Sequence, residues 1–558
     1  MSLLLSFVAA AFPALQESVS PPPAELVAED LSTAAKIVGL DFTAPEIELM
    51  LDDVIGRLGD FEALRRVELG NDVSLATGFS PWIPGVGSRS SQLGGAPLTA
   101  PRVERPERLE DVCFWSLPKL GALLRQTDVT SVELTKMYLA RIKRLDEHLH
   151  CVITLTEERA LAQAQERDVE LAAGTDRGPL HGIPWGVKDL MAVKGYRTTW
   201  GAKPFEDQVI ESTAEVVERL DEAGAVLIAK LSVGALAWGD VWFGERTRSP
   251  WDFEKGSSGS SAGSASATAA GCVAFALGTE TLGSLVSPSV ACATCALRPT
   301  FGRVSREGTM ALTWTMDKVG PITRYVGDAA LVFAAIEGRD VNDGFSRGGV
   351  VPVKNALAGD SDEGPLKGLR IGVPEGAFRG ADGLAEIKPQ LEALGAELVP
   401  VELPRYPVGA MLITLSAEAA TAFDDLTRSG ADEELVRQVR NAWPNTFRAA
   451  RLIPAVEYLR AQRLRTLLMR DVSAALEAAN VNVLVHAPYA SGILQVTNLT
   501  GHPEVVAPFV PSAGPREDGS PQTISFTGRL DCDEELMAIV AAWQSRFPNH
   551  VLHPSLGE

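Results

Sequence analysis

Hydrophobic and polar positions follow two patterns along most of this chain. In the first, apolar residues recur at intervals of three and four, as on one side of an amphipathic helix. Segment 131–149, SVELTKMYLARIKRLDEHL, has this spacing at Leu134, Met137, Tyr138 and Ile142. In the second, a short apolar run rich in β-branched residues is bounded by glycine or proline, which is typical of a buried strand. Segments 368–376 and 481–490 are examples.

The two patterns alternate after residue 105. Segments 214–231 and 388–404 each have a helical pattern followed directly by a strand pattern, and the helical pattern of segment 158–174 ends at Gly174. Repeated alternation of this kind predicts an α/β fold whose sheet is largely buried between helices.

The first 104 residues have a different character. Residues 24–70 have helical patterns, and Thr43 and Glu46 have the spacing of a capping box. Residues 78–106 are rich in glycine, proline and serine, which predicts an irregular connection. We therefore expect a signal-like or disordered N-terminus at 1–23, a helical extension with its connection at 24–104, and the main domain at 105–558.

Residues 1–16, MSLLLSFVAAAFPALQ, are apolar but too few to span a bilayer. They resemble the apolar part of a signal peptide, yet this stretch contains no Lys or Arg. Export and a cytoplasmic location both stay open, with the cytoplasm slightly favoured. No other stretch predicts a transmembrane helix.

Composition narrows the classes of partner. The 558 residues include 51 Lys and Arg against 72 Asp and Glu, a net charge of −21 that disfavours nucleic acid and anionic lipid as partners. Cys292 and Cys295 form a C-x-x-C pair, which we interpret as two buried thiols because no second pair or nearby histidine completes a metal site. The chain has no nucleotide-binding glycine motif, P-loop or H-E-x-x-H sequence, so we expect neither cofactor nor metal.

Residues 255–271, KGSSGSSAGSASATAAG, are almost all small. A flexible linker has this composition, but here the run continues into an alanine-rich helical pattern and an apolar strand pattern, which favours close packing around a site. Within it, 259–263 matches G-x-S-x-G, which would make Ser261 the nucleophile of a Ser-His-Asp esterase with His486 or His502. That motif should follow a buried strand, and the preceding RSPWDFEKGS is polar and turn-like.

Several segments in order resemble the motifs of the amidase signature family. They are LHGIPWGVKDL at 180–190, SGSSAGSASATAAG at 258–271, GTETLGS at 278–284 and LRPTFGRVS at 297–305. Weaker matches extend the resemblance over roughly residues 105–545. The resemblance implies a large mixed β-sheet covered by helices on both faces, and a serine hydrolase that cleaves a C–N amide bond, or a related ester or carbamate.

Matching each motif by position implies three catalytic residues. The family's lysine falls on Lys188, its bridging serine on Ser260 and its nucleophile on Ser284, and the peptide bond Gly259–Ser260 is expected to be cis. The backbone N–H groups of the turn before the nucleophile, at Thr281, Leu282 and Gly283, are implied as the oxyanion hole.

A lysine can accept a proton from serine only when it is neutral, so the pKa of Lys188 must lie far below its usual value. We expect apolar walls from Ile183, Trp185, Val187 and Leu190. The neighbouring Asp189 would keep the lysine charged, so its carboxylate must point elsewhere.

Three positions depart from the family pattern: Leu282 stands in place of glycine, Val286 in place of arginine and Leu190 in place of asparagine. The missing arginine makes a carboxylate-bearing substrate and a transamidosome role less favoured. We expect an apolar substrate pocket lined by Trp238, Trp242, Phe243, Trp314 and Met316, and residues 409–450 are a candidate lid.

The expected partner is a small amide, ester or carbamate, with a homodimer possible. Two alternatives stay open beside the amidase: a non-catalytic or partner-dependent subunit of the same fold, and the esterase with Ser261 as nucleophile.

Overall fold

The computed structural model describes residues 26–37, 44, 47–48, 51, 101–347, 364–451 and 453–556. The chain divides into two units, Met1–Leu69 and Gly70–Glu558. In the first, helix α1 (Ala28–Ile37) buries Leu31 and Ala35 on one side. The apolar N-terminus, most of the helical pattern at 42–58 and nearly all of the irregular connection lie outside the described residues.

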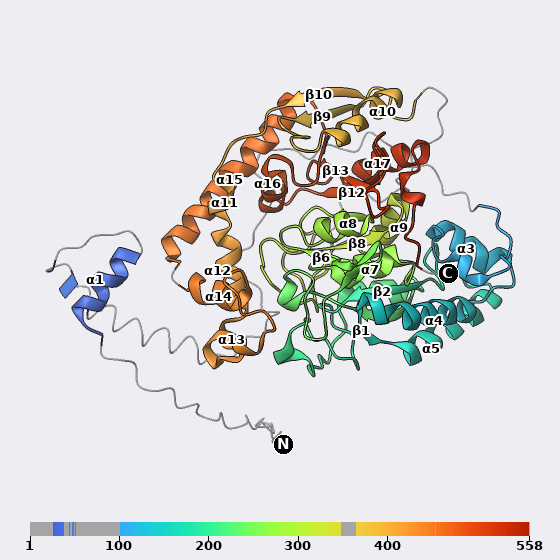
Figure 1. Ribbon diagram of the computed structural model, residues 1–558, viewed down its shortest axis with the longest axis horizontal. Helices are drawn as coiled ribbons and strands as arrows, with labels where there is room; N and C mark the ends of the chain where they lie inside the picture. Colours follow the sequence, from blue (N-terminus) through green and yellow to red (C-terminus); the bar gives the residue numbers. More distant parts are fainter. Residues whose placement is uncertain are drawn as a thin grey trace, which may run out of the picture. The chain divides into compact units, whose positions relative to one another are not determined.

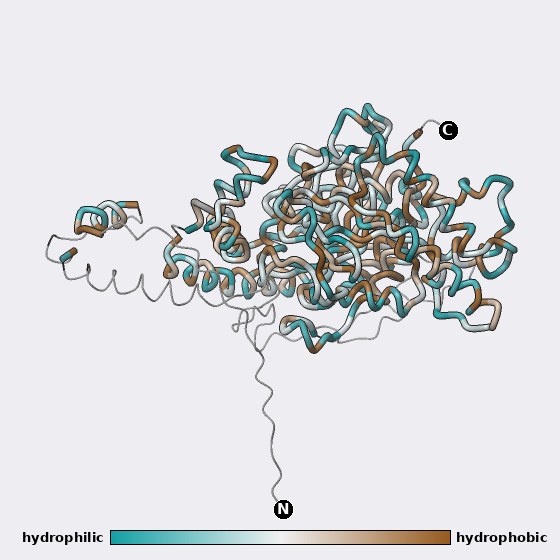
Figure 2. Tube along the Cα trace, turned by 90° about the horizontal axis from the view of Figure 1, so that it is seen from below, coloured by the Kyte–Doolittle hydropathy of each residue, from teal (hydrophilic) through white to brown (hydrophobic). Residues whose placement is uncertain are grey.

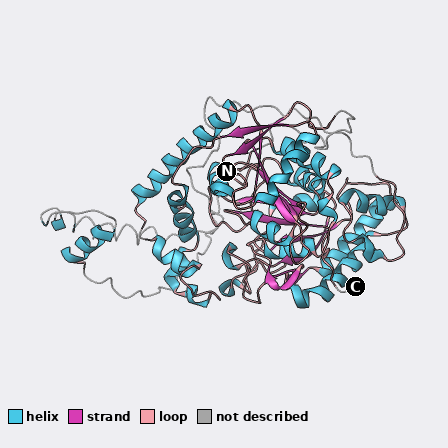
Figure 3. Ribbon diagram, turned by 45° about the horizontal axis from the view of Figure 1, so that its top comes forward, coloured by secondary structure: helices cyan, strands magenta, loops and turns pink. Residues whose placement is uncertain are grey.

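An eleven-stranded mixed sheet runs through the described part of the second unit (Figures 1 and 3). Its strands, in spatial order, are β1 (Val152–Leu155), β3 (Val226–Leu231), β2 (Pro184–Lys188), β6 (Phe275–Glu280), β8 (Lys318–Thr323), β7 (Cys295–Arg298), β12 (Glu504–Phe509), β13 (Gln522–Gly528), β11 (Val483–His486), β9 (Arg370–Pro374) and β10 (Glu397–Val401). A separate hairpin joins β4 (Arg248–Ser249) to β5 (Asp252–Gly256). The alternating pattern thus correctly predicted the fold class.

Helices cover the sheet on both faces (Figure 3). They include α3 (Leu117–Gln126), α4 (Ser131–Leu149), α5 (Glu157–Ala172), α6 (Glu215–Glu222), α7 (Ala262–Ala269), α8 (Val286–Cys292), α9 (Val326–Ile336), α10 (Ile387–Ala393), α16 (Ile493–Thr500) and α17 (Asp533–Arg546). Between β10 and β11 the chain forms α11 (Val408–Met411), α12 (Ile413–Ala422), α13 (Asp424–Ser429), α14 (Trp443–Ala450) and the long α15 (Ala455–Ala478).

Local sequence signals explain several helix boundaries. At the start of α4 the hydroxyl of Thr130 accepts a hydrogen bond from the Glu133 N–H, and the Glu133 carboxylate accepts one from the Thr130 N–H. This reciprocal pair satisfies two N–H groups that the first helical turn leaves without partners. Helix α5 ends just before Gly174, whose φ of 83° suits glycine.

The serine-rich run forms buried structure rather than a linker. Every residue of α7 is buried, and a β-carbon added at Gly263 would lie 2.3 Å from the Cys151 carbonyl oxygen. Small side chains are therefore required here because the helix lies against neighbouring backbone.

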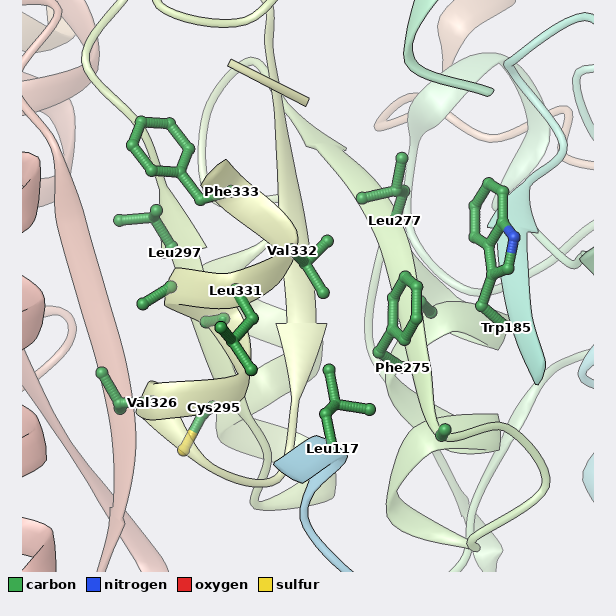
Figure 4. Close-up of a cluster of buried hydrophobic side chains, with 14 of the residues drawn as sticks. Leu117, Trp185, Phe275, Leu277, Cys295, Leu297, Val326, Leu331, Val332 and Phe333 are labelled. Atoms are coloured by element: carbon green, nitrogen blue, oxygen red, sulfur yellow. The ribbon is translucent and has the colours of Figure 1, made fainter. Parts of the chain in front are cut away.

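The main hydrophobic core lies between the sheet and its helices. Trp185 on β2 stacks on Phe275 on β6 with ring centroids 5.7 Å apart, and Leu331, Val332 and Phe333 of α9 join the same cluster (Figure 4). Figure 2 shows hydrophobic positions concentrated inside this unit. Among the described helices, none combines the length and apolar character that crossing a bilayer requires.

Parallel pairing sets up the site. Strand β2 pairs in parallel with β6, with Gly186 opposite Ala276 and Val187 opposite Leu277. This register brings Lys188, the last residue of β2, next to Thr279 near the end of β6. The carboxyl ends of parallel strands meet at one edge of a sheet, which is where α/β proteins commonly place ligand sites.

The stacked aromatic pair gives a test of the core. We expect Phe275→Ala to lower the free energy of unfolding by about 3–5 kcal/mol, because it removes a buried ring and leaves a cavity. Urea denaturation measures the change, with Val439→Ala, at a side chain 55% exposed, as the control that shifts it by less than about 0.5 kcal/mol. Equal effects of the two changes would contradict this description of the core.

Candidate active site

Lys188 lies at the centre of a buried group of hydroxyls. Its Nζ is 2.8 Å from Ser260 Oγ, 3.0 Å from Ser261 Oγ and 2.8 Å from Thr279 Oγ1. The lysine side chain is fully buried, and Ser260 is 1% exposed. The first two residues of the expected catalytic set are thus in direct contact, although 72 positions separate them.

Burial lowers the pKa of Lys188 well below 10.5, while Asp317 and Glu280 act to raise it. The expected apolar walls are wrong for Trp185 and Val187. Because side chains alternate along a strand, these two point to the face of β2 opposite Lys188, where both belong to the main core. The surroundings of the amine are hydroxyls, so it is desolvated without losing hydrogen bonds.

Asp189 points away from Lys188, as we expected from the sequence. Its Oδ1 lies 2.6 Å from Lys230 Nζ, and both side chains are fully buried. Its Oδ2 accepts hydrogen bonds from the N–H and hydroxyl of Thr199. The carboxylate is thereby neutralised by a different lysine, on the adjacent strand β3.

The loop before α7 holds Ser260 close to neighbouring backbone. The Gly259–Ser260 peptide bond is cis, as the family resemblance predicts, and a β-carbon at Gly259 would lie 1.9 Å from the Gly239 carbonyl oxygen. The N–H of Ser261 donates a hydrogen bond of 3.2 Å to the carbonyl of Ser284, which links this loop to the turn after β6.

That turn presents Ser284 and a set of backbone donors. Ser284 is 8% exposed. Gly283 has φ of 92° and little space for a side chain, which makes glycine the suitable residue. Within the described residues, no acceptor is found for the N–H groups of Thr281, Leu282, Gly283 and Ser284, which include the three expected oxyanion donors. The hydroxyl of Thr281 donates to Asp317 at 2.5 Å.

A buried charged pair, which we did not predict, supports the turn from behind. Glu280 Oε2 accepts hydrogen bonds from the N–H groups of Leu285 and Val286, at 2.8 and 3.0 Å. Its Oε1 is 2.8 Å from Arg298 Nη1, whose other carboxylate neighbour is Glu504 at 3.1 Å. Burial alone would raise the pKa of Glu280, but Arg298 lowers it to about 2. The signal was available: a charged residue inside an apolar strand pattern needs a buried partner.

Of the five residues expected to line the substrate pocket, Trp314 is in the lining of the cavity beside the site, and the other four are not. Trp314 lines a cavity together with Thr279 and Thr281. Trp238 packs edge-on against Trp443, with ring centroids 4.5 Å apart, and Trp242 packs against Phe243. Met316 belongs to a hydrophobic cluster with Leu468 and Leu484.

Helices from the candidate lid segment pack on a loop beside this cavity. The indole N–H of Trp443, in α14, donates to the carbonyl of Leu236 at 2.8 Å. Leu236 and Ala237 both have positive φ, and Ala237 lines the cavity. The helical segment therefore contributes to the shape of the pocket through this loop.

The histidines of the esterase alternative have other partners. His486 contacts the Ala487 carbonyl and the Thr527 hydroxyl, both at 2.9 Å, and His502 contacts the Thr500 hydroxyl at 2.7 Å. Burial lowers their pKa values to about 4 and about 3. Ser261 instead donates to the Thr279 carbonyl at 3.1 Å.

Both members of the C-x-x-C pair are buried thiols that donate to backbone carbonyls, Cys292 to Ser257 and Cys295 to Arg324. Among the described side chains, no group of three His, Cys, Asp or Glu is placed to hold a metal ion.

Comparison with known families decides the assignment. The model of the family described as Amidase matches residues 133–502. The chain belongs to the amidase family. Among curated relatives, a glutamyl-tRNA(Gln) amidotransferase subunit of Roseiflexus sp. (strain RS-1) is 33% identical over 76% of this chain and 96% of its own length. The subunit of the same name from Geobacillus kaustophilus (strain HTA426) is 34% identical over 79% of this chain and 99% of its own.

Solved structures of amidase-family proteins have the same fold. The native peptide amidase from Stenotrophomonas maltophilia superposes with a TM-score of 0.71 at 28% identity, over 80% of this chain and 100% of that one. The corresponding amidotransferase subunit from Thermotoga maritima gives 0.64 at 25% identity, over 80% and 98%.

The Glu280–Arg298 pair behind the turn that contains Ser284 predicts a pH-dependent stability. Glu280 has a folded pKa of about 2 against 4.5 ordinarily, so its stabilisation is present above pH 4.5 and is lost as pH falls through about 2. We expect Glu280→Gln to cost about 3 kcal/mol at pH 6, and the deficit to shrink as pH falls toward 2, measured by denaturation at each pH.

Glu504→Gln, on the other side of Arg298, is the matched control. Burial raises the pKa of Glu504 to about 7, so its contribution has the opposite sign: it is present below pH 4.5 and lost as pH rises through about 7. The same pH dependence in both variants would contradict the assigned roles.

Proposed function

We propose that this chain hydrolyses carboxylic amides through an acyl-enzyme on Ser284. The observation that carries the proposal is the 2.8 Å contact between Lys188 Nζ and Ser260 Oγ, in a place where burial lowers the pKa of the lysine. A neutral amine hydrogen-bonded to a hydroxyl is a general base suited to serine chemistry.

Hydrogen-bond accounting supports Ser260 as the residue that gives its proton to Lys188. The hydroxyl hydrogen of Ser261 goes to the Thr279 carbonyl, so Ser261 can only accept from the amine. The lone pair of a neutral Lys188 is then available to the Ser260 hydroxyl.

In the first half-reaction Ser260 passes its proton to Lys188 and takes one from Ser284, whose oxygen attacks the carbonyl carbon. The hydrogen bond from the Ser261 N–H to the Ser284 carbonyl holds the two loops together. The proton relay requires Ser284 Oγ to lie within hydrogen-bond distance of Ser260 Oγ when substrate is bound. The N–H groups of the turn from Thr281 to Ser284 are the candidates to stabilise the oxyanion, at about 3 kcal/mol of barrier for each donor.

The tetrahedral intermediate collapses as the C–N bond breaks. The leaving nitrogen takes the proton back through Ser260 from Lys188, and ammonia or an amine departs. A water molecule then attacks the acyl-enzyme, giving its proton to the same relay, and the carboxylic acid leaves with Ser284 restored. Atoms and protons balance without a further reactant.

A second candidate function is that of an amidotransferase component that works with partners. The observation that favours it is the match to subunits of glutamyl-tRNA(Gln) amidotransferases over 96–99% of their length. Against it stands Val286, where the family pattern has arginine. Turnover of a simple amide by the purified chain alone separates the two functions, because the second predicts none without a partner.

The nucleophile is tested with a panel of one amide, one ester and one carbamate. We expect Ser284→Ala to lower kcat/KM by at least about 10⁴-fold, because no neighbouring group replaces the nucleophile. Ser261→Ala, which leaves the relay residues in place, should cost far less. Equal turnover by wild type and Ser284→Ala would end the assignment, and full loss in a folded Ser261→Ala would favour the esterase alternative.

The base is tested by pH and by stability together. Because only the neutral amine accepts a proton, we expect kcat/KM to fall as pH drops through the folded pKa of Lys188. The pKa of Lys188 is well below 10.5 in the folded chain. Between this folded pKa and pH 10.5 the unfolded chain binds one more proton than the folded chain, so wild-type stability decreases as pH falls through this interval. We expect Lys188→Met to abolish activity and raise the melting temperature at pH 7, measured by calorimetry. A lower melting temperature would contradict a desolvated amine.

A further inference from the structure

A cavity of about 50 Å³ borders the candidate active site. Thr279, which contacts Lys188, and Thr281, in the nucleophile turn, are part of its lining. Much of the remaining lining is apolar: Leu190, Ala237, Met310, Leu312, Trp314 and Val319. Ser284 itself is not in the lining, so a substrate group that extends from Ser284 past Thr281 would enter a small space whose walls are partly apolar.

Arg306 is the arginine in the cavity lining. Its guanidinium already has hydrogen-bond partners within the protein. Its Nε and Nη2 lie 3.3 and 3.2 Å from the two oxygens of Asp343, and its Nη1 donates to the Trp314 carbonyl at 2.7 Å. The guanidinium also lies over the rings of Phe301 and Phe345, 5.1 and 4.8 Å from their centroids. Because Nε and Nη2 of Arg306 both bind Asp343, they are not available for a two-point contact with a substrate carboxylate.

Asp343 is held in the charged form that this pairing needs. Burial would raise its pKa, but Arg306 and the N–H groups of Arg306 and Phe345 lower it. The pair therefore contributes no net charge to the cavity.

The other charged groups of the lining do not offer a cation either. Lys318 is buried and donates to the Met316 carbonyl, and burial lowers its pKa well below 10.5. Asp317 accepts from the hydroxyls of Thr281 and Thr313 and from the N–H of Leu312. Glu307, partly exposed, adds negative charge. An anionic substrate group would meet apolar walls and carboxylates.

We infer that the substrate group entering this cavity is uncharged, so that the enzyme acts on neutral amides and rejects amides with a carboxylate at the same position. The Arg306–Asp343 pair is the specificity-determining element, because Asp343 occupies the contacts through which Arg306 would hold a carboxylate. This inference rests on the proposed amide hydrolysis and names its substrate class.

A matched pair of substrates tests the inference. Isocaproamide and succinamate have the same branching, with an isopropyl group in one where the other has a carboxylate. We expect wild type to favour isocaproamide by at least about 100-fold in kcat/KM, because an unpaired carboxylate is costly to desolvate. Comparable rates for both substrates would overturn the inference.

Asp343→Asn tests the role of the pair. It releases the charge of Arg306 while an amide oxygen keeps the contact with the Phe345 N–H. We expect the preference for isocaproamide to fall at least about 10-fold, through a lower KM for succinamate. An unchanged ratio in a folded variant would overturn the role given to Asp343. Should this variant not fold, the wild-type ratio alone decides the inference.

Asp176→Asn is the control, since it breaks a two-point pair of similar geometry with Arg125, at 2.6 and 2.7 Å, away from the cavity. It should leave the ratio unchanged, and an equal shift would show that the Asp343 effect is not local. Failure of the proposed function is distinguishable: it appears as equal turnover of isocaproamide by wild type and Ser284→Ala, whereas failure of this inference appears as efficient, Ser284-dependent turnover of succinamate.

Discussion

The site depends on an amine that is buried without a carboxylate in contact with it. A lysine removed from water loses its proton more easily, but a fully desolvated polar group is unfavourable unless hydrogen bonds replace the water. The hydroxyls of Ser260, Ser261 and Thr279 supply these bonds and carry no charge. Hydroxyl neighbours therefore give the amine hydrogen bonds while its pKa stays low. A carboxylate partner would also give hydrogen bonds, but its charge would raise the pKa of the amine.

Two carboxylates near this amine are paired with other cations. Asp189, its neighbour in the chain, is paired with Lys230. Glu280, on the adjacent strand, is paired with Arg298 and uses its second oxygen to hold the backbone after Ser284. Asp189 and Glu280 thus each have a cation of their own, whereas Asp317, within the described residues, has only hydroxyl and N–H donors and acts to raise the pKa of Lys188. The Glu280 carboxylate also holds the turn that contains Ser284.

The cavity follows the same rule. Arg306 and Asp343 neutralise each other beside apolar walls, and the helical segment at 408–450 contributes to the cavity indirectly, through the contact of Trp443 with the Leu236 loop. Strain in that loop, with two successive residues at positive φ, is maintained by this packing. In the function that we propose, substrate selection and catalysis therefore share one set of constraints on charge.

The sequence by itself determined the alternation of helices and strands, the ends of individual helices and, through motif resemblance, the expected positions of Lys188, Ser260 and Ser284. These depend on local spacing, which a single chain displays directly. The apolar walls expected around Lys188 were wrong because strand alternation sends Trp185 and Val187 to the other face. Glu280 with Arg298, and Arg306 with Asp343, were decided by the tertiary structure alone. Their partners lie 18 and 37 positions apart, and a charge in a sequence indicates that a partner is needed without indicating which residue the fold brings to it.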